Sequence, residues 1–262
     1  MDEQIPTSRY LSTSNLIYDG MKRTFDVVVG LVLLTILSPI FIITALAVRL
    51  SSKGSIFYKQ ERVGRYDRLF FVWKFRTMCS DADRNGPLIT SSDDDRITAI
   101  GKYLRKNKID ELPQLWNVII GDMSLVGPRP QVPRFVKAFP SEQRVVIMSV
   151  RPGITGPTQL QFRNEEKMLK GQRDREGYYI ENLLPIKCQM DVDYVRQRSF
   201  SLDLSVFFQT GWIIMLSLIR RMLGRNAPPA DEMEEAVVPE SFRLYYSRQE
   251  KRREEVEEVE TV

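Results

Sequence analysis

The sequence predicts an α+β fold that is mainly helical, in which a re-entrant membrane helix precedes a cytosolic domain and interfacial amphipathic helices. Three observations predict it. Residues 27–48 form an uncharged apolar run of 22 residues. The next segment alternates as a hairpin does, and later segments show the spacing of amphipathic helices. The predicted parts are an N-terminal segment, a membrane segment, a cytosolic or interfacial domain and a charged tail, at residues 1–21, 22–52, 53–226 and 227–262.

The overall charge of +4 is unevenly distributed along the 262 residues. Residues 228–262 hold eleven Asp and Glu against five Lys and Arg, so this tail carries −6 and the remainder +10. A basic body favours anionic partners, which include nucleic acid, phosphorylated small molecules and acidic lipid surfaces. Composition does not choose among them.

Cysteine and histidine usage narrows the chemistry. Cys79 and Cys188 form no framework of paired spacings, which is typical of a reduced, cytosolic setting. The chain has no histidine, so imidazole bases and histidine-ligated zinc are excluded. Any catalysis must therefore use carboxylates, Lys, Arg or hydroxyl groups.

The apolar run at residues 27–48 is long enough to enter a bilayer, at roughly 33 Å if helical. Lys22 and Arg23 precede it and Arg49 and Lys53 follow it, so the positive-inside rule gives no preferred direction. Within it, Ser38-Pro39 favours a break, because proline removes a backbone donor and serine can bond a freed carbonyl. We predict a helix that bends at Ser38-Pro39 and returns to the same face. An ordinary kinked span is the alternative.

The segment after the apolar run, "SIFYKQERVGRYDRLFFVWKFRTM", predicts a short hairpin with its turn at Gly64. Residues 79–98 are rich in turn formers and predict a loop. A helix is expected over residues 96–106.

The stretch "KIDELPQLWNVIIGDMSLVGPRP" predicts a helix that Asp110 caps, with Pro113 at its third position and Gly121 at its end. Apolar residues at helical spacing predict one buried face. These residues are Leu112, Leu115, Trp116 and Ile119.

Another apolar segment lies near the C-terminus, in "SLDLSVFFQTGWIIMLSLIRRMLGR". Its uncharged part, residues 204–219, is predicted to be too short to span comfortably, which favours a helix at the headgroup level. A buried core helix is the alternative. The tail from Ala227 onward is expected to be solvated.

Asp110 and Glu111 are neighbours, so on a helix they point roughly 100° apart and are expected to hold separate roles. At a helix N-terminus, Asp110 would stay ionised and could act as a nucleophile or a magnesium ligand, beside a bound phosphate. The simpler interpretation is a helix cap. Basic residues elsewhere in the sequence favour a role in chemistry, since arginine can donate two parallel hydrogen bonds to phosphate oxygens. These candidates are Lys74, Arg76, Arg105, Arg129 and Arg151.

Four segments together carry a resemblance to a known family. They are "KFRTM", the run "DDDRITAIGKYLRKNKIDELPQLWNVIIGDMSLVGPRP", "RPGITG" and "SFSLDLSVFFQT". In this order they resemble the bacterial sugar transferase family, the small monotopic phosphoglycosyl transferases, over about residues 22–224. A re-entrant helix broken at Ser-Pro is also a feature of that family.

The resemblance implies a phosphoglycosyl transferase that moves a sugar-1-phosphate from a UDP-sugar to undecaprenyl phosphate, releases UMP and begins a surface glycan such as an exopolysaccharide, O-antigen or capsule. It also implies a monotopic protein on the cytosolic face of the bacterial inner membrane. Expected partners are UDP-sugar, undecaprenyl phosphate and membrane lipid. A second copy of the chain is a candidate partner, and nucleic acid is not expected.

The resemblance also assigns roles to residues. It implies that Asp110 is the nucleophile, forms a covalent phosphosugar intermediate and binds Mg²⁺, with Glu111 as its catalytic partner. Lys74, Arg105 and Arg129 match positions near the phosphates. Two further acidic positions of the family match Asp191 and Asp203.

The sequence departs from the family in two places, at "GITGPTQLQFRN" and in the longer insert "EEKMLKGQRDREGYYIENLLPIK" before Asp191. Both put the identity of the sugar in doubt. Some members carry a large amino-terminal multi-span domain; because only residues 1–21 precede the membrane segment, the small form is expected.

Two rival functions stay open. In the first, residues 92–95, "SDDD", form the metal motif of a glycosyltransferase that releases UDP. In the second, the chain is a membrane-tethered scaffold without catalytic activity.

Overall fold

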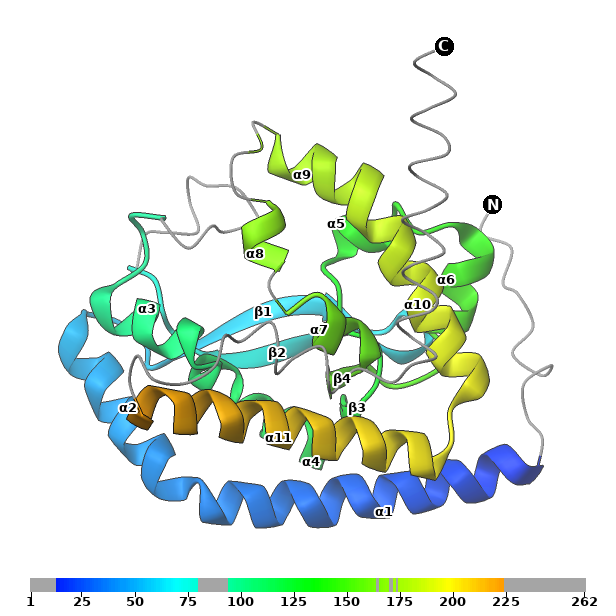
Figure 1. The fold of residues 1–262 in the computed structure, drawn as a ribbon, viewed down its shortest axis with the longest axis horizontal. Coiled ribbons are helices and arrows are strands. Elements are labelled where there is room, and N and C mark those ends of the chain that lie inside the picture. Colours follow the sequence, from blue (N-terminus) through cyan, green and yellow to red (C-terminus); the bar gives the residue numbers. More distant parts are fainter. Residues whose placement is uncertain (1–12, 80–93, 164, 170–171, 173, 224–262) are drawn as a thin grey trace. The chain divides into compact units, whose positions relative to one another are not determined.

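The computed structural model describes residues 13–79, 94–163, 165–169, 172 and 174–223. The described residues are mainly helical, with two short sheets (Figure 1). The chain divides into two compact units, residues 1–207 and residues 208–262. In chain order, the α-helices of the described residues are α1 (Thr13–Ile36), α2 (Ser38–Ser51), α3 (Ala99–Lys106), α4 (Gln114–Ile120), α5 (Pro133–Val136), α6 (Ser141–Ile147), α7 (Pro157–Gln161), α8 (Glu165–Met168), α9 (Arg175–Tyr178), α10 (Leu184–Gln197) and α11 (Phe200–Leu223).

The apolar N-terminal segment forms two helices, α1 and α2, bent by 62° at Leu37. The predicted break is confirmed to within one residue: Pro39 lies in the first turn of α2, and Ser38 Oγ donates to Thr35 O at 2.8 Å. By length and composition the pair is a broken span or a re-entrant loop. Helix α1 begins at Thr13, well before the charged flank at Lys22.

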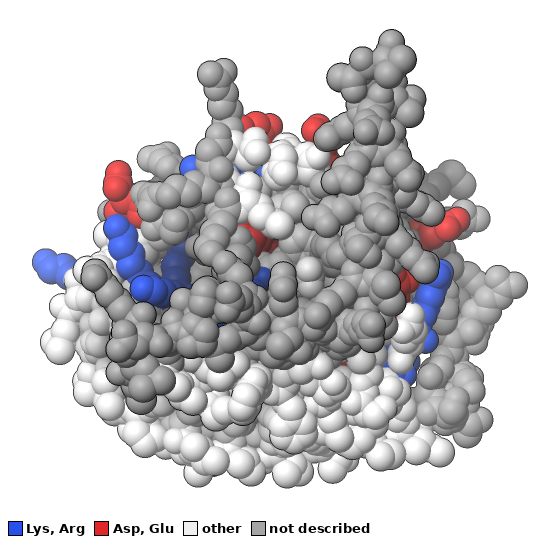
Figure 2. All heavy atoms as spheres, in the orientation of Figure 1, with Lys and Arg blue, Asp and Glu red and all other residues white. Residues whose placement is uncertain are grey.

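Helices α1 and α2 bury one face and expose the other. Val29 and Leu33 of α1 pack on the main core, and Val48 of α2 packs against Phe75 and Leu104. Figure 2 shows the uncharged surface along the lower edge, where α1 and α2 lie in Figure 1. The exposed apolar residues of these helices include Val28, Leu31, Val32, Ile36, Ile40, Ile42, Ile43, Leu46 and Leu50.

The predicted hairpin is confirmed as β1 (Phe57–Val63) and β2 (Leu69–Phe75), which pair antiparallel from Phe57↔Phe75 to Val63↔Leu69. Gly64 precedes the turn, which is the 3₁₀ segment η2 (Arg65–Asp67). The expected helix at residues 96–106 begins three residues late, as α3, because the Thr98 side chain caps it by accepting from Gly101 N at 3.0 Å.

Asp110 does not cap a helix, so this prediction is wrong. Lys108 adopts the left-handed region with φ of 56°, and the chain then makes one 3₁₀ turn, η3 (Ile109–Glu111). Helix α4 starts only after Pro113, which occupies its N-cap without a side-chain cap bond. The cause is local, because the left-handed residue and the proline confine residues 109–111 to a separate turn. Gly121 ends α4 as expected, with φ of +96°.

The buried face of α4 also differs from the prediction. Leu115 is buried, but Trp116 is 50% exposed and the other two predicted residues, Leu112 and Ile119, are only partly buried. Asn117 is fully buried instead, because its amide bonds the backbone of β2, accepting from Trp73 N at 3.1 Å and donating to Phe71 O at 2.8 Å. A polar side chain thus fixes α4 to the hairpin.

A second sheet joins the two glycine-containing motifs. Strand β3 (Ser124–Val126) pairs parallel with β4 (Gly153–Thr155), so "GPRP" and "RPGITG" lie side by side. A Cβ added to Gly153 would lie 2.1 Å from Gly127 N. Only glycine allows this approach, which brings Arg129 and the second motif into one layer.

After β4 come the short helices α7, α8 and α9, the π-helical turn η4 (Tyr179–Leu183) and α10. Residues 200–217 of α11 are long and apolar enough to cross a membrane, which corrects the prediction that this segment is too short. Its interfacial placement stays a prediction. The expected tail lies outside the described residues, as does part of the "SDDD" motif at residues 92–95.

Candidate active site

Two cations converge on Glu111, one from the hairpin and one from the "GPRP" loop. Lys74 Nζ of β2 lies 2.9 Å from Glu111 Oε1, and Arg129 Nη2 lies 2.7 Å from the same oxygen. The Glu111 side chain is only 14% exposed, so solvent screens these ion pairs weakly. The structure therefore brings together three residues that the sequence placed far apart.

Backbone contacts set the position of each partner. The Asn117 amide holds β2 in register with α4, which places Lys74 beside the turn that precedes α4. On the other side, Arg62 Nη1 donates to Pro130 O at 3.0 Å and Val63 N donates to Gln131 O at 3.0 Å. These bonds fix the loop of Arg129 against β1.

Asp110 lies in the same turn, is 8% exposed, and its Oδ1 is buried without a hydrogen-bond partner among the described residues. Burial raises the pKa of Asp110, and the negative charge of Glu111 raises it further, against Lys74, Lys108 and Arg105, which lower it. A buried acceptor without a partner costs about 1–3 kcal/mol. Such an atom is open to a ligand or to a reacting atom.

The two neighbouring carboxylates are driven apart electrostatically. Burial alone would raise the pKa of Glu111, but Arg129 and Lys74 hold it well below its usual value. Glu111 is therefore ionised and occupied by cations, whereas Asp110 keeps an unused oxygen. Environments that separate two carboxylates in this way are typical of pairs with different roles, and the separate roles of Asp110 and Glu111 stay a prediction.

Arg105 and Arg62 complete the basic surroundings. Arg105 lies in the last turn of α3 and its Nε donates to Thr77 Oγ1 at 2.8 Å, while its charge lowers the pKa of Asp110. Sequence reasoning missed Arg62, whose pKa falls to about 10 because it is buried beside Arg129. Alternation along β1 gave no sign of its role, because that role depends on the fold of the "GPRP" loop.

Four predicted site residues lie elsewhere. Arg76 donates to Ser52 O and Lys53 O, each at 2.8 Å, and so closes the end of α2. Arg151 donates to Gly121 O at 2.8 Å, at the opposite end of α4 from Asp110.

The two predicted acidic positions are both buried. Asp191 of α10 accepts from Thr158 Oγ1 at 2.5 Å, and burial raises its pKa to about 7. Asp203 of α11 accepts hydrogen bonds from three side chains at 2.6 Å each. Their donors are Tyr18, Lys22 and Tyr194. Among the described residues, neither carboxylate forms a hydrogen bond or an ion pair with the residues that contact Glu111.

The fit to Mg²⁺ depends on Asp110. Within the described residues there is no group of three or more Cys, Asp and Glu that could hold a metal ion. Mg²⁺ is commonly bound by one or two carboxylates together with substrate phosphates and water. The unpartnered Oδ1 of Asp110 fits that pattern, while Glu111 is engaged by Lys74 and Arg129.

Comparisons with known proteins identify a family. A family model described as bacterial sugar transferase matches residues 17–217. The chain is 36% identical over 197 residues to a UDP-N-acetylgalactosamine-undecaprenyl-phosphate N-acetylgalactosaminephosphotransferase of Aeromonas hydrophila, covering 74% of this chain and 43% of that protein.

Two further relatives are similar at the same level. The uncharacterized sugar transferase EpsL of Bacillus subtilis is 37% identical over 197 residues, covering 75% of this chain and 88% of that protein. A UDP-glucose:undecaprenyl-phosphate glucose-1-phosphate transferase of Escherichia coli is 34% identical over 195 residues, covering 72% and 39%. The chain spans less than half the length of the Aeromonas and Escherichia proteins.

The family match includes the bent helix pair from residue 17 onward and every residue of the cluster around Glu111. It also includes the two motifs joined by the parallel sheet. The predicted resemblance is therefore confirmed, and the chain belongs to the bacterial sugar transferase family.

Proposed function

We propose that the chain transfers a sugar-1-phosphate from a UDP-sugar to undecaprenyl phosphate and releases UMP. The observation that carries this proposal is the buried, unpartnered Oδ1 of Asp110 next to a Glu111 that two cations neutralise. A nucleophile needs a free oxygen, and a transferring phosphoryl group needs fixed positive charge around it. Two relatives are named for activity on UDP-sugars and undecaprenyl phosphate, which supports the same substrates for this chain.

The proposed reaction has two steps at one phosphorus. Asp110 Oδ1 attacks the sugar-linked phosphorus, the bond from that phosphorus to the bridging oxygen breaks, and UMP leaves with that oxygen. A phosphate oxygen of the lipid then attacks the same phosphorus and frees the Asp110 carboxylate. One site can thus serve a soluble donor and a membrane-held acceptor in turn.

Cations around the site have separable roles in this proposal. Lys74 and Arg129 hold Glu111 ionised and offer their other donors to the phosphate oxygens, and Arg105 adds charge from α3. Arg62 holds the Arg129 loop. We expect Asp110 to hold Mg²⁺ together with the donor phosphates, and the ion would supply additional neutralisation of phosphoryl charge.

We further propose a monotopic protein on the cytosolic face of the bacterial inner membrane, with α1 and α2 as a re-entrant pair. The 62° bend, the exposed apolar face and basic residues at both ends support this placement. A re-entrant pair keeps the site at the headgroup level, where the lipid phosphate lies. Accessibility labelling tests it: labels near Lys22 and Lys53 should both react from the cytosolic side only, and labelling on opposite sides would establish a span.

The function is tested by the nucleotide product and by the mass of the protein. Purified full-length chain, given UDP-sugars one at a time with undecaprenyl phosphate, should release UMP. Without the lipid, intact-mass measurement should find one sugar-phosphate adduct per chain, absent from Asp110→Asn. Release of UDP, or turnover without an adduct at Asp110, would contradict the proposed mechanism.

A matched control variant distinguishes the proposed function from the first rival, a glycosyltransferase that binds its metal through residues 92–95. If residues 92–95 were the metal motif, Asp95→Asn would abolish turnover. The proposal expects Asp95→Asn to work at the ordinary rate and Asp110→Asn to be inactive. Normal glycan priming by Asp110→Asn in cells would instead favour the scaffold.

A further inference from the structure

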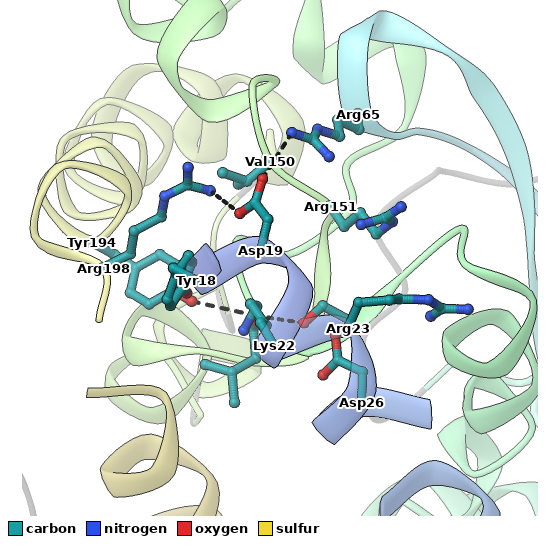
Figure 3. Close-up of a pocket in the computed structure, with 12 residues that line it drawn as sticks. Tyr18, Asp19, Lys22, Arg23, Asp26, Arg65, Val150, Arg151, Tyr194 and Arg198 are labelled. Atoms are coloured by element: carbon teal, nitrogen blue, oxygen red, sulfur yellow. Dashed lines mark hydrogen bonds and ion pairs between the residues drawn. The ribbon is translucent and has the colours of Figure 1, made fainter. Parts of the chain in front are cut away.

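A basic pocket lies against the N-terminal half of α1, away from Glu111 (Figure 3). The first turns of α1, the η2 turn, the residues before β4 and the end of α10 line it. Five of its lining residues are cationic and two are carboxylates. The cations are Lys22, Arg23, Arg65, Arg151 and Arg198, and the carboxylates are Asp19 and Asp26.

Internal partners occupy part of this charge. Lys22 Nζ pairs with Asp203 at 2.6 Å, and Arg23 donates to Val118 O and Ile119 O at the end of α4. Asp26 accepts from Leu125 N at 3.0 Å, so it is turned to the backbone. The ion pair and hydrogen bonds of these groups hold α1 against the rest of the domain.

The remaining cations outnumber their anions. Among the described residues, one carboxylate, Asp19, forms ion pairs with both Arg65, at 3.3 Å, and Arg198, at 3.4 Å. Arg151 forms no ion pair within the described residues, and its one hydrogen bond to them leaves from Nε toward Gly121 O. The N–H groups of its two terminal nitrogens therefore stay available. Burial lowers the pKa of Arg151, and the charges of Arg65 and Arg23 lower it further, against Asp19 and Asp26, which raise it.

A phosphate group suits this arrangement. Guanidinium groups present paired N–H donors that match phosphate oxygens, and an anion between Arg65 and Arg151 would relieve their repulsion. The pocket also lies where α1 becomes apolar on its outside, since Asp26 lines it and exposed Val28 and Leu31 follow on the same helix. If α1 enters the membrane as proposed, the pocket lies at the depth of the lipid phosphates.

We propose that this pocket is a second anion site, which binds a phosphate group through Arg65 and Arg151. The group comes either from the headgroup of an anionic phospholipid or from free phosphate. The lipid source rests on the proposed membrane attachment, whereas the site itself does not. Arg23 and Arg151 both bind the C-terminal end of α4 and Asp110 precedes its N-terminal end, so this site is distinct from the proposed reaction centre.

The test compares three probes on the full chain in a neutral detergent: short-chain phosphatidylglycerol, short-chain phosphatidylcholine and inorganic phosphate. Affinity is measured by native mass spectrometry for the lipids and by thermal shift for all three. The variants are Arg65→Gln and Arg151→Gln. Arg134→Gln is the matched control, because Arg134 is 63% exposed and pairs only with Glu176 in the described structure. Arg65→Lys retains the positive charge and loses the paired N–H donors of the guanidinium group.

We expect phosphatidylglycerol to bind more tightly than phosphatidylcholine, and each pocket Arg→Gln change to weaken it about tenfold. Arg65→Lys should lose less of this affinity, and Arg134→Gln should bind phosphatidylglycerol as tightly as the wild type. Inorganic phosphate binding with the same arginine dependence, and as tightly as the lipid, would support the site with free phosphate as its source. Equal losses in Arg134→Gln, or no arginine dependence with any probe, would overturn the site.

Two further measurements keep the outcomes separate. The melting temperature without ligand identifies a variant that fails to fold, and Arg65→Lys then replaces it in the comparison. The adduct at Asp110 is measured in every variant. Arginine-dependent lipid binding without an adduct in the wild type refutes only the proposed function, whereas an adduct without such binding refutes only the second site.

Discussion

Asp203 and Asp110 are both buried carboxylates near cationic side chains, yet their hydrogen bonding is opposite. Asp203 is 1% exposed and accepts from Tyr18, Lys22 and Tyr194, each at 2.6 Å. Asp110 is 8% exposed, and its Oδ1 has no partner within the described residues.

The difference separates a carboxylate that is saturated by internal contacts from one that keeps an unpartnered oxygen, which is the carboxylate we propose to react. Asp203 joins α1, α10 and the start of α11, and saturating it offsets the cost of burying its charge. Asp110 bears a desolvation cost that no internal bond offsets, as expected where a ligand or substrate completes the site. Substitution by asparagine should therefore have opposite consequences at the two positions.

The largest expected effect is on catalysis by Asp110→Asn. An amide is a poor nucleophile, so UMP release should fall roughly 10⁴-fold or more. The variant should also unfold at a higher temperature than the wild type at neutral pH, because the buried charge is gone. Turnover is measured by UMP release and stability by thermal unfolding; a variant that is active, or that is less stable, would contradict the comparison.

The second effect is on stability, through Asp203→Asn. Asparagine can still accept hydrogen bonds, but Lys22 loses its counter-charge in a partly buried position, so we expect a loss of about 3 kcal/mol. The double variant Asp203→Asn with Lys22→Met should recover part of it, since the unpaired cation is then removed. Urea unfolding of the four chains measures the coupling, and strictly additive losses would show that the pair does not interact.

The third effect is a pH dependence of stability that Asp191 should cause. An acid whose pKa is about 7 when folded and near 4 when unfolded destabilises the fold increasingly as the pH rises from 4 to 7. Asp191→Asn keeps an acceptor for Thr158, so it should stabilise the protein at pH 8 by a few kcal/mol and less at pH 5. Asp193→Asn on the same helix is the control for replacing a carboxylate with an amide in α10.

The smallest effect concerns the acid limb of the activity profile. Asp110 must be ionised to attack, and its pKa is raised above 3.8, so activity should fall as the pH drops through that raised value. Lys74→Met removes a cation that lowers the pKa of Asp110. The acid limb of the pH profile of kcat/KM should therefore move to a higher pH, by about one pH unit. Lys102→Met, at an exposed position of α3, should leave it unchanged; a downward shift after Lys74→Met would exclude Asp110 as the titrating group.

Local signals predicted much of the fold. The Ser38-Pro39 break, the hairpin and the Gly121 helix end each depend on residues within a few positions, and each is confirmed. The start of α4 was misassigned because Asp110 resembles a cap in sequence, while Lys108 in the left-handed region makes a separate turn. Nothing in the local pattern marks that conformation.

Site residues were harder to predict where their partners are distant. The proximity of Lys74 and Arg129 to Glu111 agrees with the predicted set, whereas Arg76 is engaged by backbone carbonyls beyond α2 and Arg151 by Gly121. An arginine gives the same local signal in either case, because its partner is chosen by tertiary packing. The Arg62 contact with Pro130 O was missed for the same reason.

The contact of Arg23 with the last carbonyls of α4 gives the apolar helix a mechanical connection to the reactive turn. Arg23 on α1 clamps one end of a seven-residue helix, and Asp110 and Glu111 lie just before its other end. Any tilt or vertical shift of α1 would therefore be transmitted along α4 as a displacement of Asp110, the proposed nucleophile. If α1 lies in the bilayer, lipid thickness becomes a variable that tunes the enzyme, with no regulatory domain needed to sense it.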